Sequence, residues 1–282
     1  MRTSPALRRL IPRGIARPCL GMASLMITGL GAGPAGAAEL RAEYRTYAAG
    51  LPVAEVEAGF GLGPWTYQMR LAYRTTGLVG FFYRGHQFNQ VDGTWQAGAP
   101  VPREFQGVGE WHGEPRVARI DYRDGKPLIR ALVPPNEGER EPVPPAVQAN
   151  TIDNLSAIAD LIHQVADTGR CESTVHTYDG RRATEIAART DGQETLAPTG
   201  RSSYAGPALR CSFQGELIAG FRLQGNREAD RKPLHGMAWL AQVAPNTPPI
   251  PVRMSFETRW FGDVTMYLTG VTVGQEAMAS VR

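Results

Sequence analysis

One stretch of the chain, residues 152–169, has the apolar spacing of a long amphipathic helix. Its apolar residues recur three or four positions apart, as on one helix face: Leu155, Ile158, Ala159, Ile162, Val165 and Ala166. Asp153 is a favourable N-cap, because its carboxylate can accept a backbone N–H bond from the first turn. Gly169 tolerates the left-handed conformation that ends many helices. The polar positions are expected to be a cap and a solvent-exposed face: Asp153, Asn154, Ser156, Asp160 and His163.

Nearly all of the remaining chain has the shorter period of β-strands. In residues 65–74 apolar and polar residues alternate, and one face of the predicted strand carries Trp65, Tyr67, Met69, Leu71 and Tyr73. Residues 40–49 alternate in the same way, with one side formed by Leu40, Ala42, Tyr44 and Thr46. Near the C-terminus the pattern places on one side Ile250, Val252, Met254 and Phe256. Asp-Gly pairs at 92–93, 124–125 and 179–180 predict hairpin turns, because tight hairpins need positive φ angles.

These elements together predict a mainly β fold. About a dozen strands and one principal helix favour a large curled antiparallel sheet or open barrel, with the helix packed on its concave side. Residues 134–150 are rich in proline and cannot sustain a strand ladder, so they are expected to be a surface connection into the helix. We therefore expect residues 39–282 to form a single β-rich domain.

Residues 1–38 have the pattern of a cleaved signal peptide. A short apolar core at 19–33 precedes small residues at 35–38 and follows the arginines Arg2, Arg8, Arg9, Arg13 and Arg17. The apolar core is too short for a spanning helix, which needs about 20 residues. We expect a protein of the periplasm that does not span the membrane, exported by general secretion or by the twin-arginine route.

Removing this segment changes the charge of the chain. Residues 1–38 hold five of the 30 Lys and Arg residues and none of the 27 Asp and Glu residues. The mature chain would therefore carry 25 basic residues against 27 acidic ones. A chain this close to neutral does not favour nucleic acid as a partner.

Two cysteines, Cys171 and Cys211, remain after residue 38. An exported chain meets an oxidising compartment, so we predict a disulfide between them. A metal site would need further ligands at short spacing, and His176 alone does not supply them. No metal ion and no cofactor are expected.

The common catalytic motifs are absent from the sequence. It contains no Gly-x-Ser-x-Gly, no His-Glu-x-x-His, no phosphate-binding loop and no Cys-x-x-Cys. We therefore assign no catalytic residue and favour a non-enzymatic role, with an enzyme acting on cell-wall sugar as a remote alternative.

A series of short motifs carries a family resemblance. In chain order these are Tyr44, Leu51-Pro52-Val53, Thr76-Gly77-Leu78, Asp153-Asn154-Leu155-Ser156, Cys171, Tyr178-Asp179-Gly180-Arg181-Arg182, Cys211, Ile218-Ala219-Gly220-Phe221 and Pro251-Val252-Arg253. The ordered set resembles the exported bacterial family called domain of unknown function 3108, over nearly the whole mature chain. The resemblance implies an envelope protein of mainly antiparallel β structure with no assigned activity.

Two functions are consistent with these patterns. The first is a non-enzymatic periplasmic protein that binds or carries an apolar, lipid-like envelope ligand. Its cavity would be lined from two strand faces and the helix by Trp65, Tyr67, Met69, Tyr73, Leu155, Ile158, Ile162, Met254 and Phe256. The alternative is a cell-envelope assembly or protein-interaction factor, in which the same residues form a fully packed core and the surface binds another envelope protein.

Overall fold

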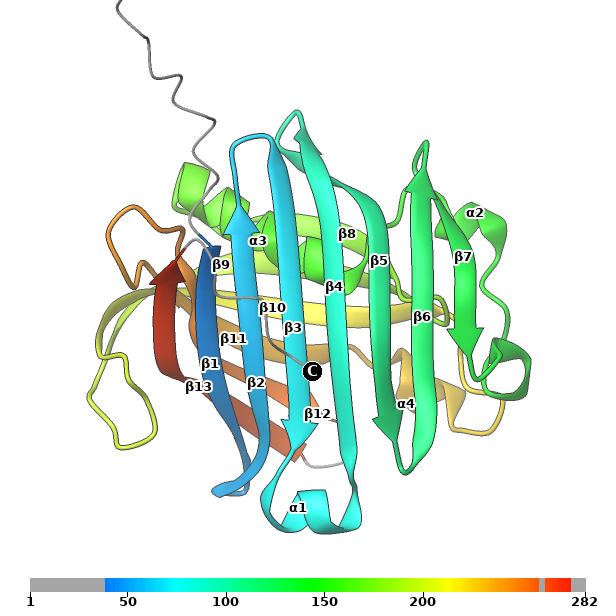
Figure 1. Ribbon diagram of the computed structural model, residues 1–282, viewed down its shortest axis with the longest axis horizontal. Helices are drawn as coiled ribbons and strands as arrows, with labels where there is room; N and C mark the ends of the chain where they lie inside the picture. Colours follow the sequence, from blue (N-terminus) through cyan, green and yellow to red (C-terminus); the bar gives the residue numbers. More distant parts are fainter. Residues whose placement is uncertain (1–38, 259–261, 275–282) are drawn as a thin grey trace, which may run out of the picture. The chain divides into compact units, whose positions relative to one another are not determined.

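A computed structural model describes residues 39–258 and 262–274 of the chain. These residues form one 13-stranded antiparallel sheet with a few helices (Figure 1). The predicted mainly β fold, a curled sheet or open barrel around one principal helix, is confirmed. The predicted signal peptide at 1–38 lies outside the described residues.

The strands fall into two runs separated by the principal helix. The first run consists of β1 (Glu39–Ala48), β2 (Leu51–Leu62), β3 (Thr66–Thr75), β4 (Gly85–Gln96), β5 (Ala99–Trp111), β6 (Glu114–Arg123) and β7 (Lys126–Val133). The second run consists of β8 (Ser173–Tyr178), β9 (Ala183–Leu196), β10 (Gly206–Ala219), β11 (Leu234–Ala241), β12 (Ile250–Thr258) and β13 (Gly262–Gly274). The helices are α1 (Gly77–Phe82), α2 (Pro145–Gln148), α3 (Asn154–Thr168) and α4 (Arg227–Arg231), with a 3-10 turn, η1 (Asn136–Gly138).

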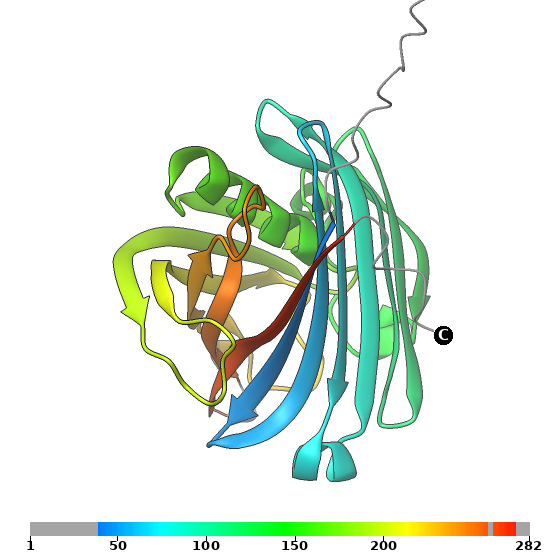
Figure 2. The ribbon, with the colours of Figure 1, turned by 60° about the vertical axis from the view of Figure 1, so that its left-hand side comes forward.

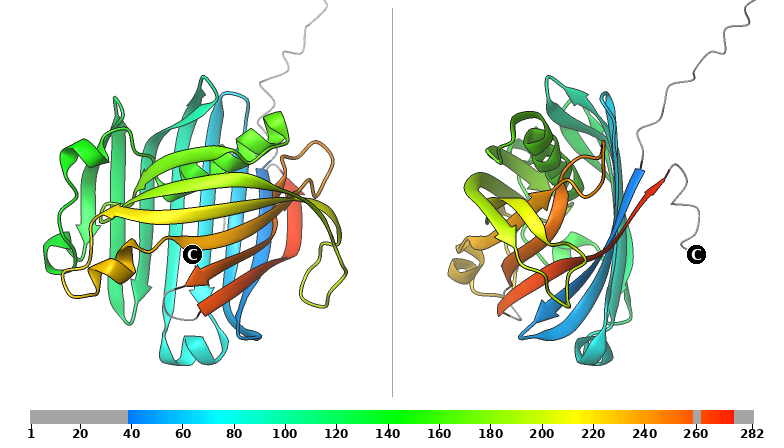
Figure 3. Two further views of the ribbon diagram at one scale, coloured as in Figure 1. Left: turned by 180° about the vertical axis from the view of Figure 1, so that it is seen from behind. Right: turned by 90° about the vertical axis from the view of Figure 1, so that its left-hand side faces the viewer.

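The first and last strands meet in the middle of the sheet. The strand order is β7-β6-β5-β4-β3-β2-β1-β13-β12-β11-β10-β9-β8, so neighbours in space are neighbours in sequence except at the β1–β13 pair. There Glu39 lies opposite Gly274 and Ala48 opposite Val264. The edges of the sheet are consequently β7 and β8, and the chain between them contains α3 (Figure 3).

Contacts between the β8–β9 turn and the opposite half of the sheet bring the two edges together. The Arg181 guanidinium donates to the Pro134 carbonyl at 2.6 Å and pairs with Glu139 at 2.9 Å. Glu139 also pairs with Arg116 of β6 at 2.7 Å. Gly180 packs so closely that a Cβ there would lie 3.1 Å from Leu132 of β7. The sheet therefore curls into a nearly closed barrel, whose two halves face each other with α3 between them (Figure 2).

Helix α3 has the ends that its sequence predicts. Asp153 accepts hydrogen bonds from the backbone N–H groups of Leu155 and Ser156 at 2.9 and 3.0 Å. Gly169 follows the last turn with a φ of 68°. The helix contacts β2, β3, β4 and β5 on one side and β8 on the other. Because both sides are covered, Ser156 and Asp160 are buried, and the expected solvent-exposed polar face is wrong at these two positions.

Two local predictions from the sequence are wrong for tertiary reasons. Asp92 and Gly93 lie inside β4 rather than in a turn, because the Tyr67 ring covers Gly93 and a Cβ there would lie 2.5 Å from it. The turn falls instead at Ala97 and Gly98, with φ angles of 49° and 80°. Trp65 is 78% exposed, because it lies in the turn between β2 and β3 rather than in the strand, which begins at Thr66.

Helix α1 exposes apolar side chains at one end of the sheet. It connects β3 to β4 (Figure 1). Its residues Leu78, Phe81 and Phe82 are 68%, 78% and 70% exposed. The backbone before it is held to β2, because the Thr76 N–H donates to the Val53 carbonyl. Within 39–258 and 262–274, no helix has the length and hydropathy required to cross a membrane.

Candidate functional site

An apolar cavity of about 250 Å³ lies between α3 and the concave face of the sheet. The helix contributes five lining residues from adjoining turns: Asn154, Ala157, Ile158, Leu161 and Ile162. The first three strands contribute Tyr44, Val56, Ala58, Phe60, Met69, Arg70 and Leu71. The second run of strands contributes Ser173, Val175, Ile186, Ala188, Phe213, Ala238, Pro251, Met254 and Met266. Every strand from β1 to β3 and from β8 to β13 therefore borders the cavity.

The wall combines fixed and adaptable side chains. Alanines and β-branched residues hold few rotamers, whereas Met69, Met254 and Met266 can change shape at low cost. Such a wall is suited to apolar contact with molecules of differing shape.

The wall residues differ in how far they are buried. Phe60 and Met69 are buried close to α3, whereas Val56, Leu71 and Met254 are only half-buried. On β2 and β3 the half-buried residues lie nearer the strand ends that adjoin α1. The cavity is therefore only partly enclosed.

The nine residues predicted from the sequence as cavity lining occupy three kinds of position. Met69, Ile158, Ile162 and Met254 border the cavity. Tyr67 and Leu155 are buried in the adjacent core. The remaining three lie away from it: Tyr73 bonds to Gln87, Phe256 packs in a separate cluster with Val264, and Trp65 lies at the surface.

A buried chain of hydrogen bonds joins the start of α3 to β3. The Ser156 hydroxyl donates to the Asp153 carboxylate at 2.5 Å and lies 2.7 Å from the Tyr67 hydroxyl. All three side chains are at most 2% exposed. Burial raises the pKa of Asp153 to about 6, although the hydrogen bonds from Ser156 and from the helix N-terminus favour the charged form.

We expect Asp153→Asn to weaken the dependence of stability on pH. The raised pKa of Asp153 stabilises the folded protein below about pH 4, and this contribution is lost as the pH rises through 6. Asparagine keeps the cap without the charge, so the stability of the variant relative to the native protein should increase by up to about 3 kcal/mol between pH 4 and 7. Urea unfolding of both proteins across this range measures the difference, and a constant difference would contradict the raised pKa.

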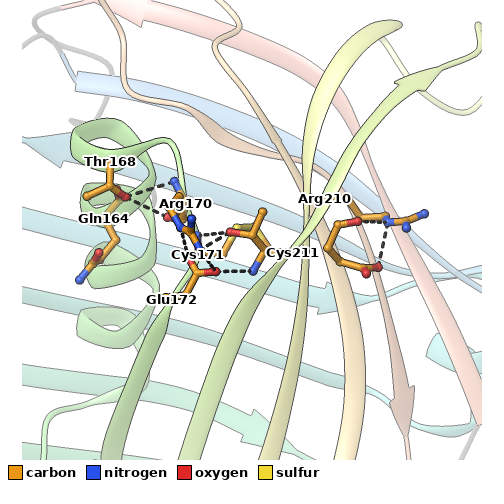
Figure 4. Close-up of a disulfide and its surroundings, with 9 residues drawn as sticks. Gln164, Thr168, Arg170, Cys171, Glu172, Arg210 and Cys211 are labelled. Atoms are coloured by element: carbon orange, nitrogen blue, oxygen red, sulfur yellow. Dashed lines mark hydrogen bonds and ion pairs between the residues drawn. A yellow bond between two sulfur atoms is a disulfide. The ribbon is translucent and has the colours of Figure 1, made fainter.

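A disulfide holds the other end of α3. Cys171 and Cys211 are bonded, as predicted, and this bond joins the segment after the helix to β10 (Figure 4). The Cys171 N–H also donates to the Thr190 hydroxyl of β9 at 2.9 Å. Both cysteines are fully buried. The helix is therefore attached to the first run of strands at its N-terminus and to the second run at its C-terminus, and the cavity lies between these attachments.

Other polar side chains near the helix are engaged with the protein. Asp160 accepts a hydrogen bond from Ser173 at 2.6 Å, and burial raises its pKa. The His163 ring stacks on Trp95 at a centroid distance of 4.1 Å. In the part of the chain that the structure describes, no three His, Cys, Asp or Glu side chains lie close enough together to hold a metal ion.

Most wall residues were not selected from the sequence, and Tyr44 is one of them. The alternation in residues 40–49 places it on the same side as Leu40 and Ala42, which the structure also buries. That signal gives the face but does not show that the residue would border a cavity. Tyr44 is 3% exposed, and its oxygen is fully buried.

The fold and the cavity define a class of nearly closed antiparallel barrel with a helix across its interior. The barrel is similar to a crystal structure titled as a beta-barrel-like protein of domain of unknown function DUF1849, from Brucella abortus, with a TM-score of 0.51 and 13% sequence identity. The match covers 85% of this chain and 99% of that one. At this identity the likeness shows the fold alone.

The sequence places the protein within a family. The family model described as "Protein of unknown function (DUF3108)" matches residues 43–269, and the chain belongs to that family. A search of the curated proteins gave no match.

Proposed function

We propose that this protein is a non-enzymatic carrier or sensor of an apolar, lipid-like ligand, held in the cavity between α3 and the sheet. The observation that supports it most directly is the cavity of about 250 Å³ with its almost wholly apolar wall. An apolar cavity of about 150 Å³ can bind benzene, and pockets for drug-sized ligands measure about 300–1,000 Å³. The size suits a small apolar molecule or a single alkyl chain.

We place this function in the periplasm. Residues 1–38 have the composition of a signal peptide, and an oxidising compartment allows the Cys171–Cys211 bond to persist. An apolar ligand of the envelope would be available there.

The alternative function is that of an assembly or interaction factor of the cell envelope. The exposed apolar side chains of α1, Leu78, Phe81 and Phe82, favour it, because exposed apolar patches often contact another molecule. This alternative needs a filled interior, however, and the cavity beside Ile158 and Met254 favours the carrier.

Native mass spectrometry of gently purified protein tests the proposal. A carrier is expected to retain a bound molecule, which denaturation and organic extraction should release as a lipid-like compound. Protein that shows only the mass of its polypeptide, and that takes up no apolar probe added afterwards, would contradict the proposed function.

Replacing Ile158 with Trp is expected to reduce the bound ligand several-fold. Ile158 borders the cavity and is half-buried, so the larger indole can fill the open space rather than displace packed neighbours. The melting temperature should change little. Ligand content by mass spectrometry and thermal unfolding by circular dichroism measure the two effects.

Two further variants control this experiment. Ala166→Trp places the same side chain at an exposed position of α3 that does not border the cavity, and should leave the ligand content unchanged. Ile158→Asp introduces a charge into the apolar wall and should destabilise the fold. If Ile158→Trp unfolds as readily as Ile158→Asp, the space is packed core and the interaction factor is favoured.

A further inference from the structure

Tyr44 borders the cavity, and its hydroxyl is a buried polar group. Tyr44 projects from β1 and pairs in register with Val56 of β2 and Leu268 of β13, which are both apolar. Its oxygen is fully buried, and among the described residues none lies within hydrogen-bonding reach of it. A phenylalanine would fill the same space without this unsatisfied group, so the hydroxyl has a cost that packing alone does not explain.

The other polar residues of the wall are engaged or exposed. Ser173 donates its hydroxyl hydrogen to Asp160. Arg70 lies between Met69 and Leu71 on β3, and its guanidinium pairs with Glu39 at 3.4 Å. Asn154 is exposed to solvent at the N-terminus of α3. Within the described lining, Tyr44 is therefore the buried polar side chain whose hydroxyl has no partner. A ligand in the cavity reaches this oxygen when the adaptable methionine side chains of the wall move aside.

The chemistry of this hydroxyl limits what it can recognise. Burial raises the pKa of Tyr44, so the group keeps its proton and can both donate and accept one hydrogen bond. The positively charged residue of the described lining, Arg70, already has Glu39 as its partner, so its charge is compensated without a ligand. A carboxylate or phosphate would lose its hydration at this position without compensation.

We propose that the cavity selects a neutral amphiphile, in which an alkyl chain carries one uncharged oxygen, such as an alcohol or ester, that hydrogen-bonds to the Tyr44 hydroxyl. This inference rests on the proposed function and adds the chemical class of the ligand to it. The chain of the ligand contacts the methionines and aliphatic residues, and its oxygen is placed at β1.

The test compares 1-hexanol with heptane, which have equal numbers of non-hydrogen atoms, on the native protein and on Tyr44→Phe. Displacement of N-phenyl-1-naphthylamine, a neutral fluorescent probe, gives both dissociation constants. We expect Tyr44→Phe to bind 1-hexanol about tenfold more weakly, the loss of one neutral hydrogen bond, and to bind heptane as the native protein does.

Tyr122→Phe is the matched control. The Tyr122 hydroxyl is also buried without a partner among the described residues, but Tyr122 does not border the cavity. This variant should bind both ligands with native affinity, which separates recognition by Tyr44 from any general effect of removing a buried hydroxyl.

Each outcome decides between the two proposals. If Tyr44→Phe leaves both affinities unchanged, or weakens both equally, the Tyr44 inference is overturned while the apolar cavity stands. A water molecule bound at the hydroxyl would give the first of these results. If the native protein binds neither 1-hexanol nor heptane, the proposed function itself is overturned.

Discussion

Replacing Cys171 and Cys211 together with alanine is expected to lower the free energy of unfolding by about 4 kcal/mol. The two residues are 40 positions apart, and the bond removes the conformational freedom of that loop from the unfolded chain. Alanine suits both sites because each is fully buried in apolar surroundings. Urea unfolding of the double variant and the native protein measures the difference.

The native protein under reducing conditions provides the control. Its stability should fall to that of the double variant, and no further loss should occur when the variant itself is treated with the reductant. Hydrogen exchange should also increase in the last turn of α3, near Val165 and Gly169, since the bond attaches this end to β10. A double variant as stable as the native protein would show that packing alone holds the helix end.

The second large effect is expected from Ile162→Asp, with a loss of at least about 3 kcal/mol. Ile162 is fully buried and borders the cavity from α3, so an ionised carboxylate there would have neither water nor a charged partner. Urea unfolding at pH 7 measures the change.

Ile162→Val is the matched variant, because it removes one methylene group and adds no charge. It should cost about 1 kcal/mol. If the aspartate costs no more than the valine, the cavity is hydrated rather than apolar, and the carrier proposal loses its main support.

Local signals in the sequence are sufficient for the helix and for the faces of the strands. The capping of α3 depends on Asp153 and Gly169, which act within one turn of the helix ends, so residues 152–169 predict its limits closely. On β3, the alternation correctly places Tyr67 and Met69 in the interior. These features follow from the backbone period alone.

Features that depend on distant parts of the chain were not predictable. Period-two alternation gives the face of a strand but not the height at which α3 crosses the sheet, so Met69 borders the cavity while Tyr73 does not. Gly93 follows an aspartate as in many turns, but it lies within β4, where the Tyr67 ring of the neighbouring strand packs against it and leaves no space for a side chain. The same limit applies to Tyr44, whose unpartnered hydroxyl is apparent only when β2, β13 and α3 are placed around it.

The central position of the β1–β13 pair determines the order in which the sheet can be completed. As the chain is synthesised from its N-terminus, β1 can pair with β2 early, but its other edge stays open until β13 emerges near the C-terminus. An open strand edge is a template for wrong pairing, so the growing chain carries an aggregation hazard in its middle rather than at its final edges. A nascent chain truncated before β13 would hold two half-sheets with no strand pairing between them, a substrate for chaperones and proteases.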